Sequence, residues 1–120
     1  MKQDVSKLDL ITLEIIANGL RSIADECFVA LMRSAYSTNI KERRDHSIAI
    51  VDKNGRLVVQ AAFALPIHIA SMSGLMQGVL EKYGEDIQEG DIFVANDPHT
   101  AGGTHLPDIN YAMPIFVEGE

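Results

Sequence analysis

Apolar residues recur at spacings of three and four along the first third of the chain. They are Leu13, Ile16, Leu20, Ile23, Cys27, Leu31 and Ala35. Polar side chains occupy much of the opposite side, so the pattern predicts one amphipathic helix over Leu10–Ala35 with this stripe in a core. Ser6 and Asp9 are both suitable N-caps for that helix, and together they match a capping box.

The segment after this helix has the pattern of a β-hairpin. Polar residues at 37–39 end the helix, and a strand is expected over Ser47–Val51. A turn at 52–55 contains Asn-Gly, a pair that supplies the positive φ angles of tight hairpin turns, and the second strand covers Leu57–Gln60. His46 stands directly before the first strand and is interpreted as a strand-start histidine.

The second half of the chain predicts one further helix and two further strands. An irregular connector at Ala61–Pro66 leads into a methionine-rich helix over Ile69–Tyr83, which closes at Gly84. A third strand spans Asp91–Ala95, a fourth begins near Asp108, and 113–117 reads as the start of another. The fold class is therefore α+β (mixed α/β), with the order of the strands left open.

Between the third and fourth strands lies the stretch richest in chemistry, residues 96–108. It reads Asn-Asp-Pro-His-Thr-Ala-Gly-Gly-Thr-His-Leu-Pro-Asp. Two prolines and a glycine pair exclude a helix interior and a central strand, so the segment is expected to be a loop. Loops held between regular elements are where binding and catalytic side chains concentrate, which makes this one the candidate site.

Composition limits the classes of function. A 120-residue chain with a net charge of −7 has the size of one domain and lacks the clustered basic residues of a nucleic-acid groove. No apolar run is long enough to span a membrane, and the start of the chain is not a secretion signal, so no membrane partner is expected. The sole cysteine, Cys27, cannot form an internal disulfide. These features favour the cytoplasm.

The end of the chain suggests an incomplete domain. The last apolar run is followed directly by Gly119 and Glu120, with no element to pair or cover it. We therefore expect residues 1–120 to be the amino-terminal segment of a longer domain.

The loop offers ligands for a divalent metal. His105 and Asp108 form a His-x-x-Asp step in which Pro107 stiffens the backbone before the carboxylate. Imidazole and carboxylate together suit first-row divalent metals, which activate water or polarise a carbonyl oxygen. Gly102 and Gly103 allow close approach to a ligand, and their amides are suited to holding an oxyanion. No phosphate-binding loop or nucleophile elbow is present.

Several polar residues also have a purely structural explanation. Asp97 is typical of a turn before proline, and His99 of a solvated loop position. Asp45 is equally explained as the ion-pair partner of the two preceding arginines. His68 is placed either to cap or to pack beneath the second helix, and Thr104 to bond the loop backbone.

The order of these motifs resembles the hydantoinase B family. The matching stretches are Ile11–Ile16, Asp45-His46-Ser47, Gln60-Ala61, Pro66-Ile67-His68 with Ser71-Met72, and Asn96–Asp108. That family includes the B-type subunits of N-methylhydantoinases, the corresponding part of 5-oxoprolinases, and subunits of acetone and acetophenone carboxylases. The resemblance extends over nearly the whole chain.

The resemblance implies a division of labour between subunits in a hetero-oligomer. A hydantoinase A-type partner binds and uses ATP, while the B-type subunit carries a divalent metal (Mn, Zn or Fe). By motif, Asp45, His105 and Asp108 correspond to metal ligands. A further histidine of the family falls beyond residue 120, so an isolated 1–120 product is expected to bind metal poorly or not at all.

The expected activity is ring-opening hydrolysis of a cyclic amide of the hydantoin or 5-oxoproline type. In this interpretation Gly102, Gly103 and Thr104 contact the substrate, and His68 and His99 transfer protons. One alternative is a subunit of an ATP-dependent ketone carboxylase. Another is a truncated, non-catalytic assembly module that docks through its long helix.

Overall fold

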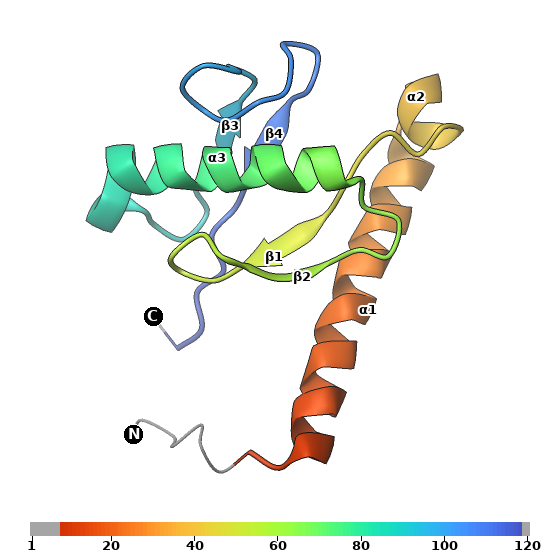
Figure 1. The fold of residues 1–120 in the computed structure, drawn as a ribbon, viewed down its shortest axis with the longest axis vertical. Helices are drawn as coiled ribbons and strands as arrows, with labels where there is room; N and C mark the ends of the chain where they lie inside the picture. Colours follow the sequence, from red (N-terminus) through yellow and green to blue (C-terminus); the bar gives the residue numbers. More distant parts are fainter. Residues whose placement is uncertain (1–7, 119–120) are drawn as a thin grey trace. The chain divides into compact units, whose positions relative to one another are not determined.

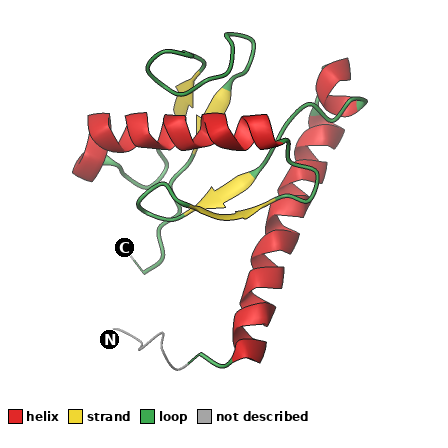
Figure 2. Cartoon of the chain, in the orientation of Figure 1, coloured by secondary structure: helices red, strands yellow, loops and turns green. Residues whose placement is uncertain are grey.

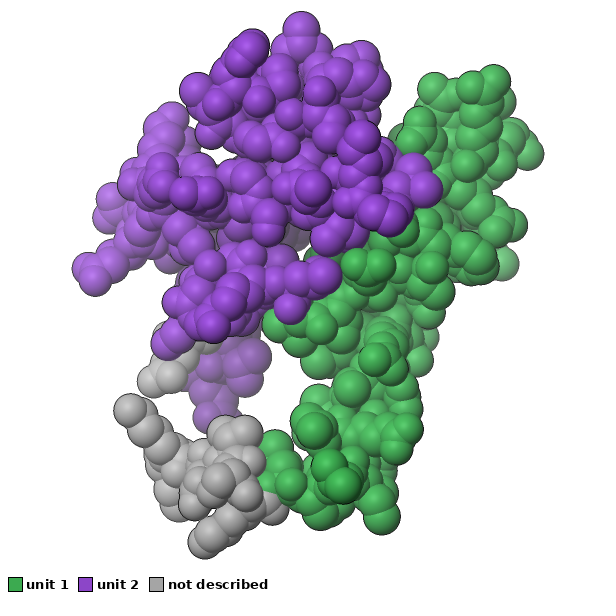
Figure 3. Space-filling view, in the orientation of Figure 1, with its two compact units in different colours: residues 1–50, 58–64 green, residues 51–57, 65–120 purple. Residues whose placement is uncertain are grey.

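The computed structural model describes residues 8–118, which fall into two compact units coloured separately in Figure 3. Unit 1 comprises the described residues up to Ile50 together with Val58–Ala64. Unit 2 comprises Val51–Leu57 and the described residues from Leu65 onward. Helices and short strands are both present, so the architecture is α+β, as predicted (Figure 2).

Helix α1 (Leu10–Ser34) confirms the predicted long helix almost to the residue. Asp9 is its N-cap: the carboxylate accepts hydrogen bonds from the backbone N–H and the hydroxyl of Thr12, each at 2.9 Å. Ser6, the other proposed cap, lies outside the described residues. After α1, the polar segment at 37–39 does more than end the helix, because it enters a four-residue helix α2 (Thr38–Lys41).

The core of unit 1 uses only a small part of the predicted apolar stripe of α1, together with residues at its edge. Ala24 and Phe28 are buried with Val59 and Ala61, and four partly buried residues pack against them: Leu20, Ile48, Ile50 and Ala64. The predicted core positions Leu13, Ile16, Ile23 and Leu31 are exposed, and so is Cys27. Periodicity identified the apolar side of the helix correctly. It could not show that the covering segments of unit 1 reach only the part around Ala24 and Phe28.

The hairpin is confirmed, but its turn differs from the one expected. Strand β1 (Ala49–Val51) pairs with β2 (Leu57–Gln60), so the first strand starts two residues later than predicted. Gly55 has φ 76°, while Asn54 does not take a positive φ. The Gly55 N–H donates to the Asp52 carbonyl at 2.9 Å, and the Asp52 N–H donates to the Arg56 carbonyl at 2.8 Å. This is a three-residue loop with glycine at its single left-handed position.

Helix α3 (Pro66–Tyr83) begins three residues before the predicted start. Pro66 occupies its first turn, where a missing N–H costs nothing, so the proline is part of the helix and not of the connector. The helix closes at Gly84 (φ 48°), as predicted, and a 3₁₀ turn η2 (Gly84–Asp86) follows. Ser71, Leu75 and Val79, at spacings of four, form its buried face.

Strands β3 (Phe93–Ala95) and β4 (Asn110–Ala112) pair antiparallel, with Phe93 opposite Ala112 and Ala95 opposite Asn110. Strand β3 starts two residues after the predicted Asp91, and β4 starts two residues after Asp108, near which its start was predicted. The strand expected over 113–117 is absent from the described part of the chain, which is irregular after Ala112. Pro114 lacks the N–H that a ladder requires, and this explains why the apolar run does not extend β4. The β3–β4 loop lies beside α3 in unit 2 (Figure 1).

Candidate functional site

Asp97 organises the start of the β3–β4 loop. One carboxylate oxygen accepts the His99 N–H at 2.7 Å, and the other accepts the Thr100 hydroxyl at 2.6 Å. The Thr100 hydrogen bond, followed by the His99 N–H, lowers the pKa of Asp97 below its ordinary value. The interpretation of Asp97 as a turn residue is therefore confirmed.

The loop is also closed by bonds across it. The Asn96 side-chain amide donates to the Leu106 carbonyl at 2.9 Å. The Asp97 carbonyl accepts the backbone N–H groups of Ala101 at 3.2 Å and Gly103 at 3.3 Å. These bonds fix the backbone through which the chain reaches the His105–Asp108 step.

His105 and Asp108 form the chemical centre of the loop. The Nε2 atom of His105 lies 2.7 Å from Oδ1 of Asp108, and the Thr104 hydroxyl donates to Oδ2 of the same carboxylate. The His105 side chain is 62% exposed and that of Asp108 is 24% exposed, so the pair can be reached from solvent. The structural explanation expected for Thr104 was a hydrogen bond to the loop backbone. In the structure the Thr104 hydroxyl bonds the Asp108 side chain instead.

Opposing effects act on the pKa of Asp108. Partial burial is the largest and raises it, but the hydrogen bonds from Thr104 and His105, with the charges of His105 and His68, outweigh burial. The pKa of Asp108 is therefore lowered, and the carboxylate is ionised at neutral pH. An ionised carboxylate beside an imidazole is the state in which both groups can bind a metal.

The two histidines assigned to proton transfer differ in position. His68 is half-buried in the first turn of α3, and its charge is close enough to act on Asp108. It is not the N-cap, which is Leu65, although its N–H donates to the Leu65 carbonyl at 3.0 Å. The exposed His99 is tied to the loop through its backbone N–H.

The glycines assigned to substrate binding are both engaged within the protein. Gly102 (φ +67°) lies with its Cα directly against Gly74 of α3. The Gly103 amide already donates to Asp97. Their contact with a substrate stays a prediction.

Asp45, the third predicted metal ligand, belongs to unit 1, whereas His105 and Asp108 belong to unit 2. Its side chain is exposed, and its N–H donates to the Asn39 carbonyl at 2.9 Å. Among residues 8–118, no three or more histidine, cysteine or acidic side chains form a group that could hold a metal ion. The structure thus brings together two of the predicted ligands, and the three-residue set stays a prediction.

Sequence reasoning missed the role of His46. It is 7% exposed, its ring stacks on Phe28 with 3.9 Å between centroids, and its Nε2 lies 3.0 Å from the Phe28 carbonyl oxygen. A histidine beside the alternating apolar residues of the hairpin was the available signal. His46 anchors the segment that carries Asp45 to α1.

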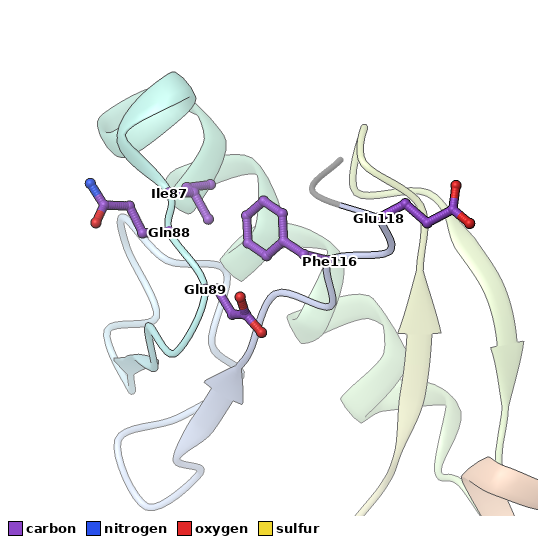
Figure 4. Close-up of a pocket in the computed structure, with 5 residues that line it drawn as sticks. All are labelled: Ile87, Gln88, Glu89, Phe116 and Glu118. Carbon is purple, nitrogen blue, oxygen red and sulfur yellow. The ribbon is translucent and has the colours of Figure 1, made fainter. Parts of the chain in front are cut away.

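A surface hollow elsewhere in unit 2 does not contain the candidate residues. It has a volume of about 520 Å³ and is lined by Ile87, Gln88, Glu89, Phe116 and Glu118. Figure 4 shows its lining side chains, with the ring of Phe116 turned toward Ile87. The candidate site is therefore the solvent-facing loop and not this hollow.

Comparison with known proteins shows the family to which this chain belongs. The hydantoinase B/oxoprolinase family matches residues 9–120, and the chain belongs to this family. The chain is 40% identical over 112 residues to 5-oxoprolinase 1 of Arabidopsis thaliana, a match that covers 93% of this chain and 9% of that protein. It is 38% identical over 119 residues to a 5-oxoprolinase of Dictyostelium discoideum, with 99% and 9% covered.

A bacterial relative also matches nearly the whole of this chain. The chain is 28% identical over 120 residues to a putative B-type subunit of a D-/L-hydantoinase from a Pseudomonas strain, covering 98% of this chain and 20% of that protein. The chain thus spans about a tenth of the oxoprolinases and a fifth of the bacterial hydantoinase protein.

No solved structure matches. None of the helices described in residues 8–118 has the length and apolarity needed to cross a membrane.

Proposed function

We propose that this chain forms part of the metal site of a B-type hydantoinase or oxoprolinase subunit, which opens a cyclic amide ring by hydrolysis. The observation that carries the proposal is the His105–Asp108 pair at 2.7 Å, oriented by Thr104 and reachable from solvent. Family membership supports the substrate class, because relatives across 93–99% of this chain are named oxoprolinases.

The chemistry of the three predicted ligands suits a divalent ion. His105 offers an imidazole nitrogen, and Asp108 and Asp45 offer carboxylates, a mixture suited to Mn, Zn or Fe. The lowered pKa of Asp108 favours the ionised form that a metal requires. A bound ion supplies a Lewis acid that activates water and polarises the ring carbonyl.

The other candidate residues are proposed to act around the substrate ring. His68, whose charge contributes to the lowered pKa of Asp108, is proposed to transfer protons, and His99 is a second candidate for this role. Thr104 and the Gly102–Gly103 amides are proposed to stabilise negative charge on the carbonyl oxygen. Because the Gly103 amide donates to Asp97, the substrate oxygen must share or replace that bond.

ATP is assigned to a partner chain of the hydantoinase A type. One relative is named as the B-type subunit of a hydantoinase, which supports a multi-subunit enzyme. This part of the proposal predicts that the protein purifies as a hetero-oligomer with an ATP-consuming chain.

The test measures bound metal and turnover in the protein purified with its partner chain. We expect stoichiometric Mn, Zn or Fe, and ATP-dependent ring opening of 5-oxoproline or hydantoin. His105→Ala and Asp108→Asn should both lose metal and reduce turnover by about 100-fold or more, since an incomplete ligand set fails to hold the ion in place. Asp86→Asn changes an exposed carboxylate in η2 of the same unit and serves as the matched control.

Two outcomes would contradict the proposal. One is full metal content and turnover in both site variants. The other is a purified pair that consumes ATP with a ketone and bicarbonate but leaves hydantoin and 5-oxoproline unchanged, which assigns carboxylation instead.

A further inference from the structure

One stripe of α3 follows the β3–β4 loop along its length. Ser71, Gly74 and Gly78 lie on the same helix face at spacings of three and four. Each of the three lies against a different point of the loop or of the strand that follows it. We call these three residues the α3 stripe.

The two glycines of the stripe make the closest approaches. A methyl group added at Gly74 would overlap the Cα of Gly102 and lie 3.1 Å from its nitrogen. A methyl group added at Gly78 would lie 3.3 Å from the Thr100 carbonyl oxygen. The helix backbone and the loop backbone are therefore packed against each other with no room for a side chain at Gly74.

The stripe also holds the exit of the loop. The Ser71 hydroxyl donates to the His68 carbonyl at 2.8 Å, and its oxygen lies 3.3 Å from the Asn110 side-chain oxygen; both Ser71 and Asn110 are buried. Asn110 begins β4, two residues after Asp108. The loop is thus located at Thr100, Gly102 and Asn110, on both sides of the His105–Asp108 pair.

We propose that Gly74 and Gly78 are positioning residues for the metal pair, because they let the loop that carries His105 and Asp108 pack directly on α3. This inference rests on the proposed metal site. Gly102 has the same role on the loop side, because its φ of +67° is rarely adopted by other residues and its Cα fills the space above Gly74. Neither glycine of α3 is a metal ligand or a substrate contact.

The decisive variant is Gly74→Ala. Alanine favours helix over glycine, so α3 itself is not weakened, and the added methyl acts by displacing the loop. We expect metal binding to weaken by about 10- to 100-fold, the range seen when residues supporting metal ligands are lost. Gly78→Ala, whose methyl would meet only one oxygen at 3.3 Å, should have a smaller effect in the same direction.

The matched control is Gly19→Ala. Gly19 is also a helix-interior glycine, but a methyl group there has nothing within 4 Å. The experiment compares metal dissociation constants of the three variants in the protein purified with its partner chain. Amide hydrogen exchange of Ala101 and Gly103, which donate to Asp97, reports on the loop without reference to any metal.

The expected result is weaker metal binding and faster exchange of both loop amides in the order Gly74→Ala, Gly78→Ala, Gly19→Ala, with unfolding midpoints that do not follow this order. If Gly74→Ala changes neither the exchange of the loop amides nor the metal affinity, while His105→Ala abolishes metal binding, the positioning role of Gly74 is refuted. The proposed function then stands. If the loop amides exchange faster in Gly74→Ala but the unsubstituted protein holds no metal, the positioning role is supported and the proposed function is rejected.

Discussion

Replacing His46 tests how the segment carrying Asp45 is anchored to α1. His46→Ala removes the ring stacked on Phe28 at 3.9 Å and the hydrogen bond from Nε2 to the Phe28 carbonyl at 3.0 Å. An aromatic stack contributes about 0.5–1.5 kcal/mol and a net hydrogen bond about 0.5–1.5 kcal/mol. The void left by a ring that is only 7% exposed adds to both. We therefore expect a loss of about 2–4 kcal/mol in the free energy of unfolding.

His46→Phe separates the stack from the hydrogen bond. Phenylalanine keeps an aromatic ring on Phe28, and the Phe28 carbonyl keeps its partner within the helix, four residues on. The substitution also removes Nδ1, which is buried and has no hydrogen-bond partner among the described residues. The cost of the lost bond and the gain from removing that nitrogen are similar, so the free energy of unfolding should stay within about 1 kcal/mol of the parent.

Urea unfolding followed by far-ultraviolet circular dichroism measures these differences. The slopes should be equal in the parent and both variants, which identifies the change as one of stability. If His46→Ala unfolds within about 0.5 kcal/mol of the parent, or His46→Phe is as damaging as His46→Ala, the anchoring role is refuted.

Three other outcomes are expected. The lowered pKa of Asp97 means that its contribution to loop stability is present above its ordinary value of 3.8 and is lost as the pH falls below it. Exchange of the Gly103 amide, corrected for its intrinsic pH dependence, should therefore rise under acid in the parent and change less in Asp97→Asn. Gly55→Ala should destabilise the hairpin turn by about 1 kcal/mol or more, because Gly55 has φ +76° and its new methyl would lie 3.0 Å from Cβ of Met76. Gly90→Ala, with a positive φ but open space, should cost less, and the urea unfolding described above measures both changes in the free energy of unfolding. Finally, prolonged dialysis against a chelator should abolish ring opening, and one of Mn, Zn or Fe should restore it; activity that survives with no metal detected would count against the metal site.

The local elements were largely predictable because their signals lie within a few residues of one another. Asp9 before an apolar-periodic run gave the start of α1, and Gly84 gave the end of α3. Pro66 was the exception. It was assigned to the connector, although a proline is equally suited to the first turn of a helix.

Burial was harder to predict than secondary structure. The heptad-like stripe of α1 is apolar at Leu13, Ile16 and Ile23, and all three are exposed, while Ala24 and Phe28 next to the stripe are buried. Which face is covered depends on segments distant in sequence, here 58–64, and periodicity within the helix contains no information about them.

For the site, the sequence identified the loop and the His-x-x-Asp step, and these do come together. It did not identify the support beneath them. Gly74 and Gly78 stand in an ordinary helical pattern, and only the path of residues 100–102 across α3 shows why they lack side chains. Tertiary contacts of this kind leave no short-range signature.

The arrangement of α1 has a practical consequence for mutagenesis. Its strongest apolar positions by hydropathy, among them Ile11 at 73% and Ile15 at 65% exposure, contribute nothing to the core of unit 1, whereas the inconspicuous Ala24 is wholly enclosed. A lysine at Ile11 would leave that core intact, and a side chain as small as valine at Ala24 would overpack it. Polar substitutions at exposed apolar positions of α1, such as Ile11 and Ile15, therefore leave the core of unit 1 intact, whereas Ala24 must stay unchanged.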